Sequence, residues 1–205
     1  MDASEYRKDP CGASALPLWK TERIAVPEHM RVVRDDAYDS AQYAAWHDTR
    51  YFKLRHDLKN LKKPALPDGY EPISPDAAAL ARHICACYDE EGVTAEELEA
   101  YRAHPVYDGA LWLALAADGG EIAASGIAEL DKRIGEGVLE WIQVSQAYRR
   151  QGLGAFVVRE LLRRMKQSGA AFATVSGKLD GKTNPLALYE ACGFGDRTVW
   201  HILTK

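Results

Sequence analysis

The stretch Val144-Ser-Gln-Ala-Tyr-Arg-Arg-Gln-Gly-Leu-Gly154 joins an expected strand to an expected helix through a polar, basic loop. Apolar residues precede it in the run 138–144, and after Gly152 apolar residues recur at helical spacing along one face. Backbone N–H groups at a helix start have no partner within the helix, and the helix dipole adds positive potential there. Glycines let a ligand approach the backbone closely, and Arg149 and Arg150 add positive charge. The stretch therefore predicts a loop that binds an anion such as phosphate or pyrophosphate.

Two common phosphate-binding motifs do not match this loop. A Walker loop needs a lysine after its second glycine, but Ala155 follows Gly154 here. A dinucleotide fingerprint needs a third glycine or alanine where Val157 stands, and it begins directly after its strand. Seven residues separate Val144 from Gly152, so neither motif accounts for the stretch.

The pattern Arg149-x-x-Gly152-x-Gly154 resembles the signature [RQ]-x-x-G-x-[GA] of the GNAT superfamily of N-acetyltransferases. Downstream, Leu188-Tyr-Glu-Ala-Cys-Gly-Phe194 resembles the second hallmark of that superfamily. The resemblance covers residues 69–205 and is specific over 138–195. It implies an α/β fold (mixed α+β) with a mixed, twisted sheet that has helices on both faces. The sheet is expected to splay between its fourth and fifth strands, here 138–144 and 170–175.

The resemblance also implies acetyl-CoA as co-substrate, bound in the splay. Pantetheine would pair with the backbone of Ile142 and Val144, beside the Arg149 loop. The implied reaction is direct attack of a neutral primary amine on the thioester in a ternary complex, with a small-molecule or peptide amine as acceptor. The alternative is a non-catalytic acyl-CoA-binding sensor or regulatory module. The pyrophosphate would meet the backbone N–H groups of Arg150, Gln151, Gly152, Leu153 and Gly154.

Two side chains are the expected catalytic groups. Tyr189 matches the general acid of the superfamily and would protonate the leaving thiolate, although a tyrosine there can also serve only to pack the core. Glu140 is the candidate base, because regular alternation would place its side chain on the same face as those of Ile142 and Val144. A solvated strand carboxylate is the alternative for Glu140. The sequence departs from the superfamily pattern at Asn184, which lies closer to Tyr189 than expected.

The turn-rich run 64–69 divides the chain into an N-terminal extension, residues 1–68, and a GNAT domain, residues 69–205. Residues 1–20 are expected to be an irregular arm. Residues 41–62 are expected to form a helix docked on the main domain, with one apolar stripe of Tyr51, Leu54, Leu58 and Leu61.

Beyond residue 69 the patterns predict alternating strands and helices. Ser74 is the expected cap of a helix that reaches about Glu91, and Thr94 opens a capping box with Glu97. Further helices are expected from Gly152 to Gly169 and over 185–192. The expected strands are 70–73, 111–117, 121–130, 138–144, 170–175 and 197–203.

Composition and charge narrow the classes of binding partner expected for this protein. The 205 residues carry 26 Lys and Arg against 30 Asp and Glu, which argues against a general nucleic-acid binder. No apolar run approaches the roughly 18 residues of a membrane span, and the N-terminus lacks a secretory pattern, so we expect a cytoplasmic protein without membrane contact. Cysteine and histidine spacing predicts no metal site. The resemblance also allows a homodimer, since dimers are common in the superfamily.

Overall fold

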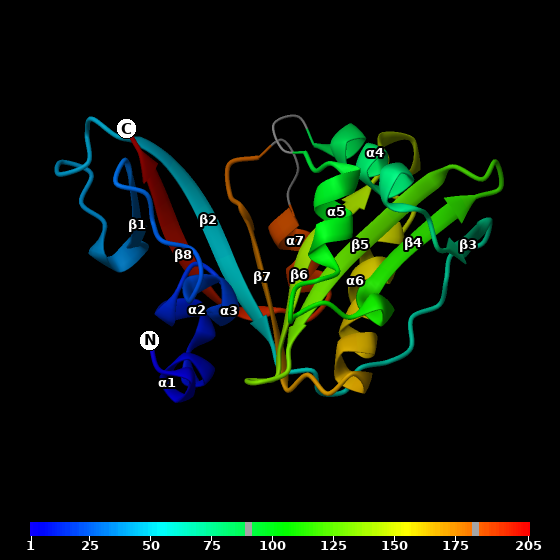
Figure 1. Ribbon diagram of the computed structural model, residues 1–205, viewed down its shortest axis with the longest axis horizontal. Coiled ribbons are helices and arrows are strands. Elements are labelled where there is room, and N and C mark those ends of the chain that lie inside the picture. Colours follow the sequence, from blue (N-terminus) through cyan, green and yellow to red (C-terminus); the bar gives the residue numbers. More distant parts are fainter. Residues whose placement is uncertain (89–91, 182–184) are drawn as a thin grey trace. The chain divides into compact units, whose positions relative to one another are not determined.

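The computed structural model describes residues 1–88, 92–181 and 185–205 (Figure 1). Its contacts group into two compact units. The first unit comprises Met1–Asp57 and Thr174–Lys205, and the second unit comprises Leu58–Ala173. The domain boundary at residue 68 that the sequence suggests stays a prediction. The splay expected between strands 138–144 and 170–175 also stays a prediction, because the second of these strands lies where the chain passes from one unit to the other.

The second unit is a four-stranded sheet in the order β6-β5-β4-β3, and its strand pairs are antiparallel. Gly126 of β5 pairs with Ile142, near the end of β6. The loop that follows β6 and contains the predicted anion site, residues 145–154 (the anion loop), therefore lies at one end of the sheet. All the strands and helices expected here are present, with shifted ends. They are β3 (Tyr70–Ile73), α4 (Ala77–Cys87), α5 (Ala95–Tyr101), β4 (Trp112–Ala117), β5 (Ile122–Asp131), β6 (Glu136–Val144) and α6 (Leu153–Gln167), with 3₁₀ turns at Gly109–Leu111 and Gln146–Tyr148.

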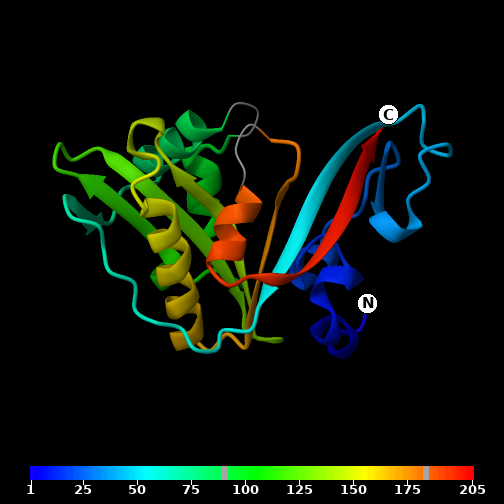
Figure 2. The same ribbon diagram turned by 180° about the vertical axis from the view of Figure 1, so that it is seen from behind.

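Helices cover both faces of this sheet, as predicted (Figures 1 and 2). Helices α4 and α5 pack on one face, where Ile127 and Trp141 meet the apolar residues of α4. Helix α6 packs on the other face, where a Cβ on Gly126 would lie 2.6 Å from Val157. Neighbouring residues of β5 thus face opposite layers, as strand geometry requires.

The first unit holds strands in the order β1-β8-β2-β7, with β8 antiparallel to both β1 and β2. Asp48 pairs with Leu203, and the register shifts between Lys53 and Arg55. The elements are α1 (Ala3–Lys8), α2 (Pro10–Ala13), α3 (Leu18–Thr21), β1 (Met30–Arg34), a 3₁₀ turn at Asp35–Ala37, β2 (His47–His56), β7 (Phe172–Lys178, of which residues from Thr174 belong to this unit), α7 (Pro185–Ala191) and β8 (Gly195–Thr204).

The prediction of an irregular arm over residues 1–20 is wrong, because this segment folds into three short helices. Lys53 explains much of the order. Its ammonium is buried and donates to the Tyr6 hydroxyl at 3.0 Å and to the carbonyls of Ser14 and Leu16 at 2.9 Å each. A buried charge must be hydrogen-bonded, so the arm satisfies Lys53 while it covers the sheet. Such long-range contacts leave no local pattern in the sequence.

The prediction of a helix over 41–62 is also wrong, because residues 47–56 form strand β2. Phe52, Lys53 and Leu54 are consecutive and all buried, because both faces of β2 are covered: the arm covers Lys53, and the Phe52 ring packs 6.1 Å from the Tyr189 ring of α7. Leu58 and Asn60 have positive φ values of 56° and 54°, which a right-handed helix does not allow. The aromatic residues of this run, which favour strands, were the overlooked signal.

Helix α4 begins later and ends earlier than expected. Asp76, not Ser74, is its cap, and the Asp76 carboxylate accepts a hydrogen bond from the Ala79 N–H at 2.6 Å. Tyr88 is already extended, and the expected end at Glu91 lies outside the described residues. The capping box of Thr94 and Glu97 is confirmed.

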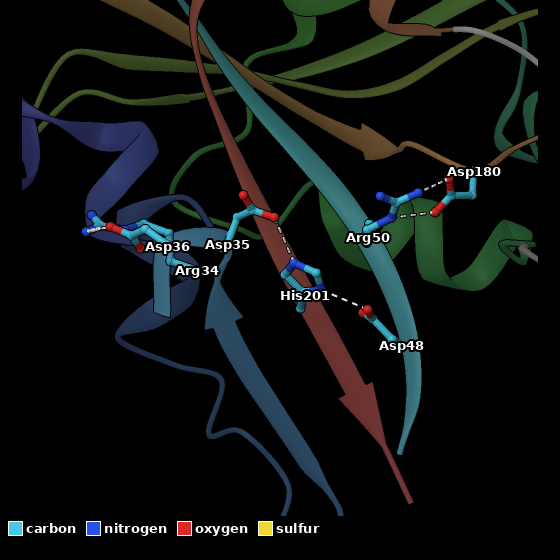
Figure 3. A network of polar contacts seen from close by, with 7 residues as sticks. All are labelled: Arg34, Asp35, Asp36, Asp48, Arg50, Asp180 and His201. Atoms are coloured by element: carbon cyan, nitrogen blue, oxygen red, sulfur yellow. Dashed lines mark hydrogen bonds and ion pairs between the residues drawn. The ribbon is translucent and has the colours of Figure 1, made fainter. Parts of the chain in front are cut away.

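A polar network ties the strands of the first unit together (Figure 3). His201 on β8 is buried, and its Nε2 and Nδ1 atoms lie 3.0 Å from Asp35 and 2.8 Å from Asp48. Arg50 on β2 makes a two-pronged contact with Asp180 at 3.0 and 2.6 Å. The network joins the Asp35 turn, β2 and β8.

Within the ranges that the structure describes, no helix has the length and apolar character needed to span a membrane.

Candidate functional site

The loop between β6 and α6 presents a row of backbone donors. Arg150 and Gly152 have positive φ values of 66° and 84°, and α6 starts at Leu153 without a side-chain cap. Among the described residues, no hydrogen bond is donated by the backbone N–H groups of 150–154. Residues 149–152 are exposed, Leu153 is buried and Gly154 is half-buried. This local geometry is what the sequence predicts for an anion site.

The outer edge of β6 carries carbonyls that point away from β5. The Ser145 N–H donates to the Ala123 carbonyl at 2.9 Å and is therefore directed toward β5. Because direction alternates along a strand, the backbone N–H and C=O groups of Ile142 and Val144 point away from β5. A ligand strand could therefore pair with them, as expected.

Two side chains occupy these carbonyls in the structure. The Tyr88 hydroxyl donates to Ile142 O at 3.2 Å. Arg149 Nε donates to Val144 O, also at 3.2 Å. Both bonds are long and come from side chains that can rotate, so a ligand N–H could replace either donor.

The alternation argument for Glu140 assumes an unbroken strand, and β6 has a bulge at this residue. Ala128 of β5 pairs with Leu139 and the next residue back, Ile127, pairs with Trp141, so Glu140 is an extra residue in β6. A bulge of this kind interrupts the regular alternation of side chains. The role of Glu140 as base stays a prediction, without support from strand parity.

Tyr189 lies in the first unit, whereas Glu140 and the anion loop lie in the second. Its side chain is buried on α7, with ring centroids 6.1 Å from Phe52 and 5.7 Å from Phe194. These contacts match the packing alternative. They do not test its role as general acid, and Asn184 lies outside the described residues.

A cleft of about 330 Å³ borders the other side of the loop, between Tyr70, Tyr148 and the β4–β5 turn. The Tyr70 hydroxyl donates to Gln151 Oε1 at 2.6 Å. Asp68 and Asp118 also line the cleft, so it does not suit a phosphate.

The sequence patterns did not single out three buried or half-buried polar residues where α4 meets the end of β6. These are His83 on α4, Gln143 on β6 and Ser145 directly after β6. His83 Nδ1 lies 3.2 Å from Ser145 Oγ, and burial lowers the pKa of His83 to about 4. The Gln143 amide donates to Ser125 Oγ. The only sequence signal was a polar residue on the apolar stripe of α4, between Leu80 and Ile84. Burial also raises the pKa of the Cys87 thiol, which disfavours a reactive thiolate.

Within the described residues, no group of three or more histidine, cysteine or acidic side chains is placed to hold a metal ion.

The family model for the acetyltransferase (GNAT) family matches residues 77–194, more than half of the chain. The chain belongs to the GNAT family. Members transfer an acyl group from acetyl-CoA to an amine. The matched range contains the donor row after β6 and the Tyr189 segment, so the GNAT resemblance of the sequence is confirmed.

Solved GNAT structures share the fold at low identity. A GNAT protein from Sphaerobacter thermophilus is 19% identical, with a TM-score of 0.70 over 84% of this chain and 58% of that one. A tandem GNAT protein of the clavulanic acid pathway is 17% identical, with a TM-score of 0.63 over 86% of this chain and 63% of that one. The ribosomal-protein-S18-alanine N-acetyltransferase of Escherichia coli is 21% identical, with a TM-score of 0.52 over 65% of this chain and 91% of that one.

The chain thus spans less than two thirds of the length of the Sphaerobacter and tandem GNAT proteins. None of the curated proteins matches this sequence significantly. The mixed α/β fold, with a sheet between helical layers, is the fold of the GNAT family.

Proposed function

We propose that this GNAT protein transfers the acetyl group of acetyl-CoA to a primary amine by direct attack within a ternary complex. One observation carries the proposal: the unbonded N–H row of 150–154 stands next to the outward-facing backbone of Ile142 and Val144. The first feature suits a pyrophosphate and the second suits an amide-containing chain. Acetyl-CoA contains both, in that order.

The residues have the following roles in this proposal. The N–H groups of 150–154 and the Arg149 side chain bind the pyrophosphate. A backbone N–H of β6 polarises the thioester carbonyl as the amine attacks. Glu140 accepts the amine proton, directly or through water, and Tyr189 protonates the departing thiolate. The acceptor is a small-molecule or peptide amine.

Calorimetric titration with acetyl-CoA, with CoA as comparison, tests the donor site. Saturable micromolar binding supports it. Gly152→Ala places a side chain at a φ of +84°, which costs about 1–2 kcal/mol and is expected to weaken binding about tenfold. Gly169→Ala is the matched control, since Gly169 has a φ of +96° and open space around it, and it lies just past the opposite end of the 15-residue helix α6. Absence of binding by folded, CoA-free protein would overturn the proposal.

Turnover separates the enzyme from the alternative acyl-CoA sensor. In a primary-amine panel, Tyr189→Phe is expected to slow turnover while the acetyl-CoA dissociation constant stays the same. Unchanged turnover would assign Tyr189 to packing alone. Tight acetyl-CoA binding without turnover of any amine would favour the sensor.

A further inference from the structure

The cleft of about 330 Å³ beside the anion loop has no role in the reaction proposed above. It lies where β3 begins next to the end of β4, since Tyr70 pairs with Ala117. The β4–β5 turn and the anion loop complete its wall. Pockets that hold small ligands have volumes of about 300 Å³ or more, so the cleft is large enough for one small molecule.

Two half-buried tyrosine rings form part of the wall of this cleft. The ring centroids of Tyr70 and Tyr148 are 6.0 Å apart, and the ring planes are nearly perpendicular, at 88°. The Tyr70 hydroxyl donates to Gln151 Oε1 at 2.6 Å. The Tyr148 hydroxyl donates to a carboxylate oxygen of Glu121. Because both hydroxyls are engaged, the two rings are held in place as aromatic walls.

In the described part of the chain, the charged side chains that line the cleft are all acidic. They are Asp68 and Asp118, and Glu121 adds a third carboxylate through its bond to Tyr148. Asp68 and Asp118 are exposed, and neither carboxylate has a hydrogen-bond or ion-pair partner within the described ranges. Carboxylates that share one cleft repel one another, and a cation placed among them removes that repulsion.

Aromatic walls and carboxylates together select one kind of ligand. A cation is attracted to the face of an aromatic ring, and aromatic cages are the usual recognition sites for quaternary ammonium ions. A bare ammonium is a compact and strongly hydrated charge, so it gains less from a half-open aromatic cleft. An alkylated ammonium presents apolar methyl groups to the rings and its positive charge to the carboxylates.

The cleft adjoins the predicted anion site. Gln151 lines the cleft, and its backbone N–H belongs to the row of 150–154 that makes no hydrogen bond within the described ranges. The carboxylates of the cleft therefore lie close to the expected pyrophosphate and repel it. A cation in the cleft would cancel this repulsion and so favour binding of the anion.

We propose that this cleft binds a small alkylated ammonium ion and that its occupancy raises the affinity of the anion loop for acetyl-CoA. The second half of this inference rests on the proposed function, whereas the first half does not. Because coupling between two binding sites is reciprocal, acetyl-CoA is expected to raise the affinity for the cation by the same factor.

The first experiment uses choline and 3,3-dimethylbutan-1-ol, which has the same shape but carries carbon in place of the charged nitrogen. NMR titration of the full-length protein without acetyl-CoA follows the side-chain amide of Gln151. Choline is expected to bind in the millimolar range and to move this resonance. The neutral analogue is expected to bind about tenfold more weakly, because it lacks the charge that the rings and carboxylates attract.

Matched variants test which groups attract the cation. Asp68→Asn and Asp118→Asn each remove one exposed charge and are each expected to weaken choline binding about threefold. Tyr70→Leu removes one aromatic wall and is expected to have an effect of similar size, about threefold. Glu96→Gln is the control, because it makes the same change of charge at an exposed position on α5, outside the cleft.

The coupling is measured by calorimetric titration with acetyl-CoA in saturating choline chloride, with sodium chloride at the same concentration as the control for ionic strength. Choline is expected to lower the dissociation constant of acetyl-CoA about threefold. The double variant of Asp68→Asn and Asp118→Asn is expected to bind acetyl-CoA about threefold more tightly even without choline. Choline should then have no further effect, because the charges that it neutralises are absent.

Each half of the inference has its own contradicting result. Equal binding of choline and its neutral analogue, or unchanged choline binding in the double variant, would overturn the cation site. A trimethyl-lysine peptide that binds far more tightly than choline would overturn the assignment to a small molecule. Equal effects of choline chloride and sodium chloride on acetyl-CoA affinity would overturn the coupling. Failure of acetyl-CoA to bind at all would contradict the proposed function, and choline binding would still decide the cleft by itself.

Discussion

His83 is a buried titratable residue whose surroundings affect the stability of the protein. It occupies the apolar stripe of α4 and yet keeps one nitrogen bonded to Ser145 and the other without a donor among the described residues. The Ser145 hydroxyl also donates to Ile122 O at 2.9 Å, so one side chain joins His83 of α4 to the start of β5.

This environment predicts a specific pH dependence of stability. Burial lowers the pKa of His83 from 6.5 to about 4. Below pH 6.5 the unfolded chain binds a proton that the folded chain does not, so the contribution is complete above that pH and is lost as the pH falls toward 4. We expect His83 to account for about 2–3 kcal/mol of the loss in unfolding free energy between about pH 7.5 and about pH 4.5.

Urea unfolding of the wild-type protein and of His83→Phe over this pH range measures the contribution of His83 to the unfolding free energy. The contributions of all other titrating groups cancel when the two proteins are compared. The variant is expected to lose less stability on acidification. Ile84→Val is expected to keep the wild-type slope, and equal slopes for wild type and His83→Phe would contradict the assignment.

At the scale of elements, the α6–sheet contact positions the anion loop. Gly126 allows α6 to approach β5 closely: a Cβ there would lie 2.6 Å from Val157 Cγ1 and 2.7 Å from Leu161 Cδ1. Both side chains are fully buried, so neither has room to move away. The start of α6, and with it the N–H row, is held at a fixed distance from the end of β6.

Gly126→Ala is therefore expected to lower the unfolding free energy by about 1–3 kcal/mol, as overpacked cores do. Adding Val157→Ala should recover part of the loss by making room for the new methyl group. Gly119→Ala, with open space around it, is the control. Chemical denaturation measures all four proteins, and a Gly126→Ala variant as stable as the control would show that the contact is loose.

Elements with a strong local pattern were predicted well, and those without one were not. Helix α6 has an apolar stripe and glycines at both ends, and β4 and β5 are joined by a glycine turn. By contrast, Tyr51 and Leu54 of the stripe that suggested a helix over 41–62 lie on strand β2, and Leu58 and Leu61 follow that strand. A residue's distant neighbours can override its local periodicity.

At the scale of the whole chain, the N-terminal arm is part of the core of the first unit. Tyr6 and Leu18 are buried, and Trp200 Nε1 donates to Cys11 O at 2.9 Å. The Lys53 ammonium relies on the arm for its three hydrogen bonds. The arm therefore supplies both apolar cover and hydrogen-bond acceptors to β2 and β8.

Deletion of residues 1–21 is expected to lower the melting temperature by about 10 °C, because several large side chains lose their burial. The truncated protein should also bind an apolar dye. A synthetic peptide of residues 1–21 should restore melting, and the same peptide with Leu18→Asp should not. Unchanged melting after truncation would show that the arm is dispensable.

The sequence by itself determined the family and most of the elements beyond residue 69, and it predicts the anion loop. These depend on local features, namely glycines at positive φ, caps and apolar periodicity, which neighbouring residues express wherever they occur. The family resemblance singled out Ile142 and Val144, and the structure shows that their backbone groups point away from β5.

Only the tertiary structure decided the order of the arm, the strand at 47–56, the bulge at Glu140 and the contact of His83 with Ser145. Each of these depends on which distant groups meet: Lys53 with the arm, β2 with β8, Ala128 with Leu139, and α4 with the end of β6. Burial and hydrogen bonding between remote segments carry no local periodicity, so no window of the sequence could reveal them.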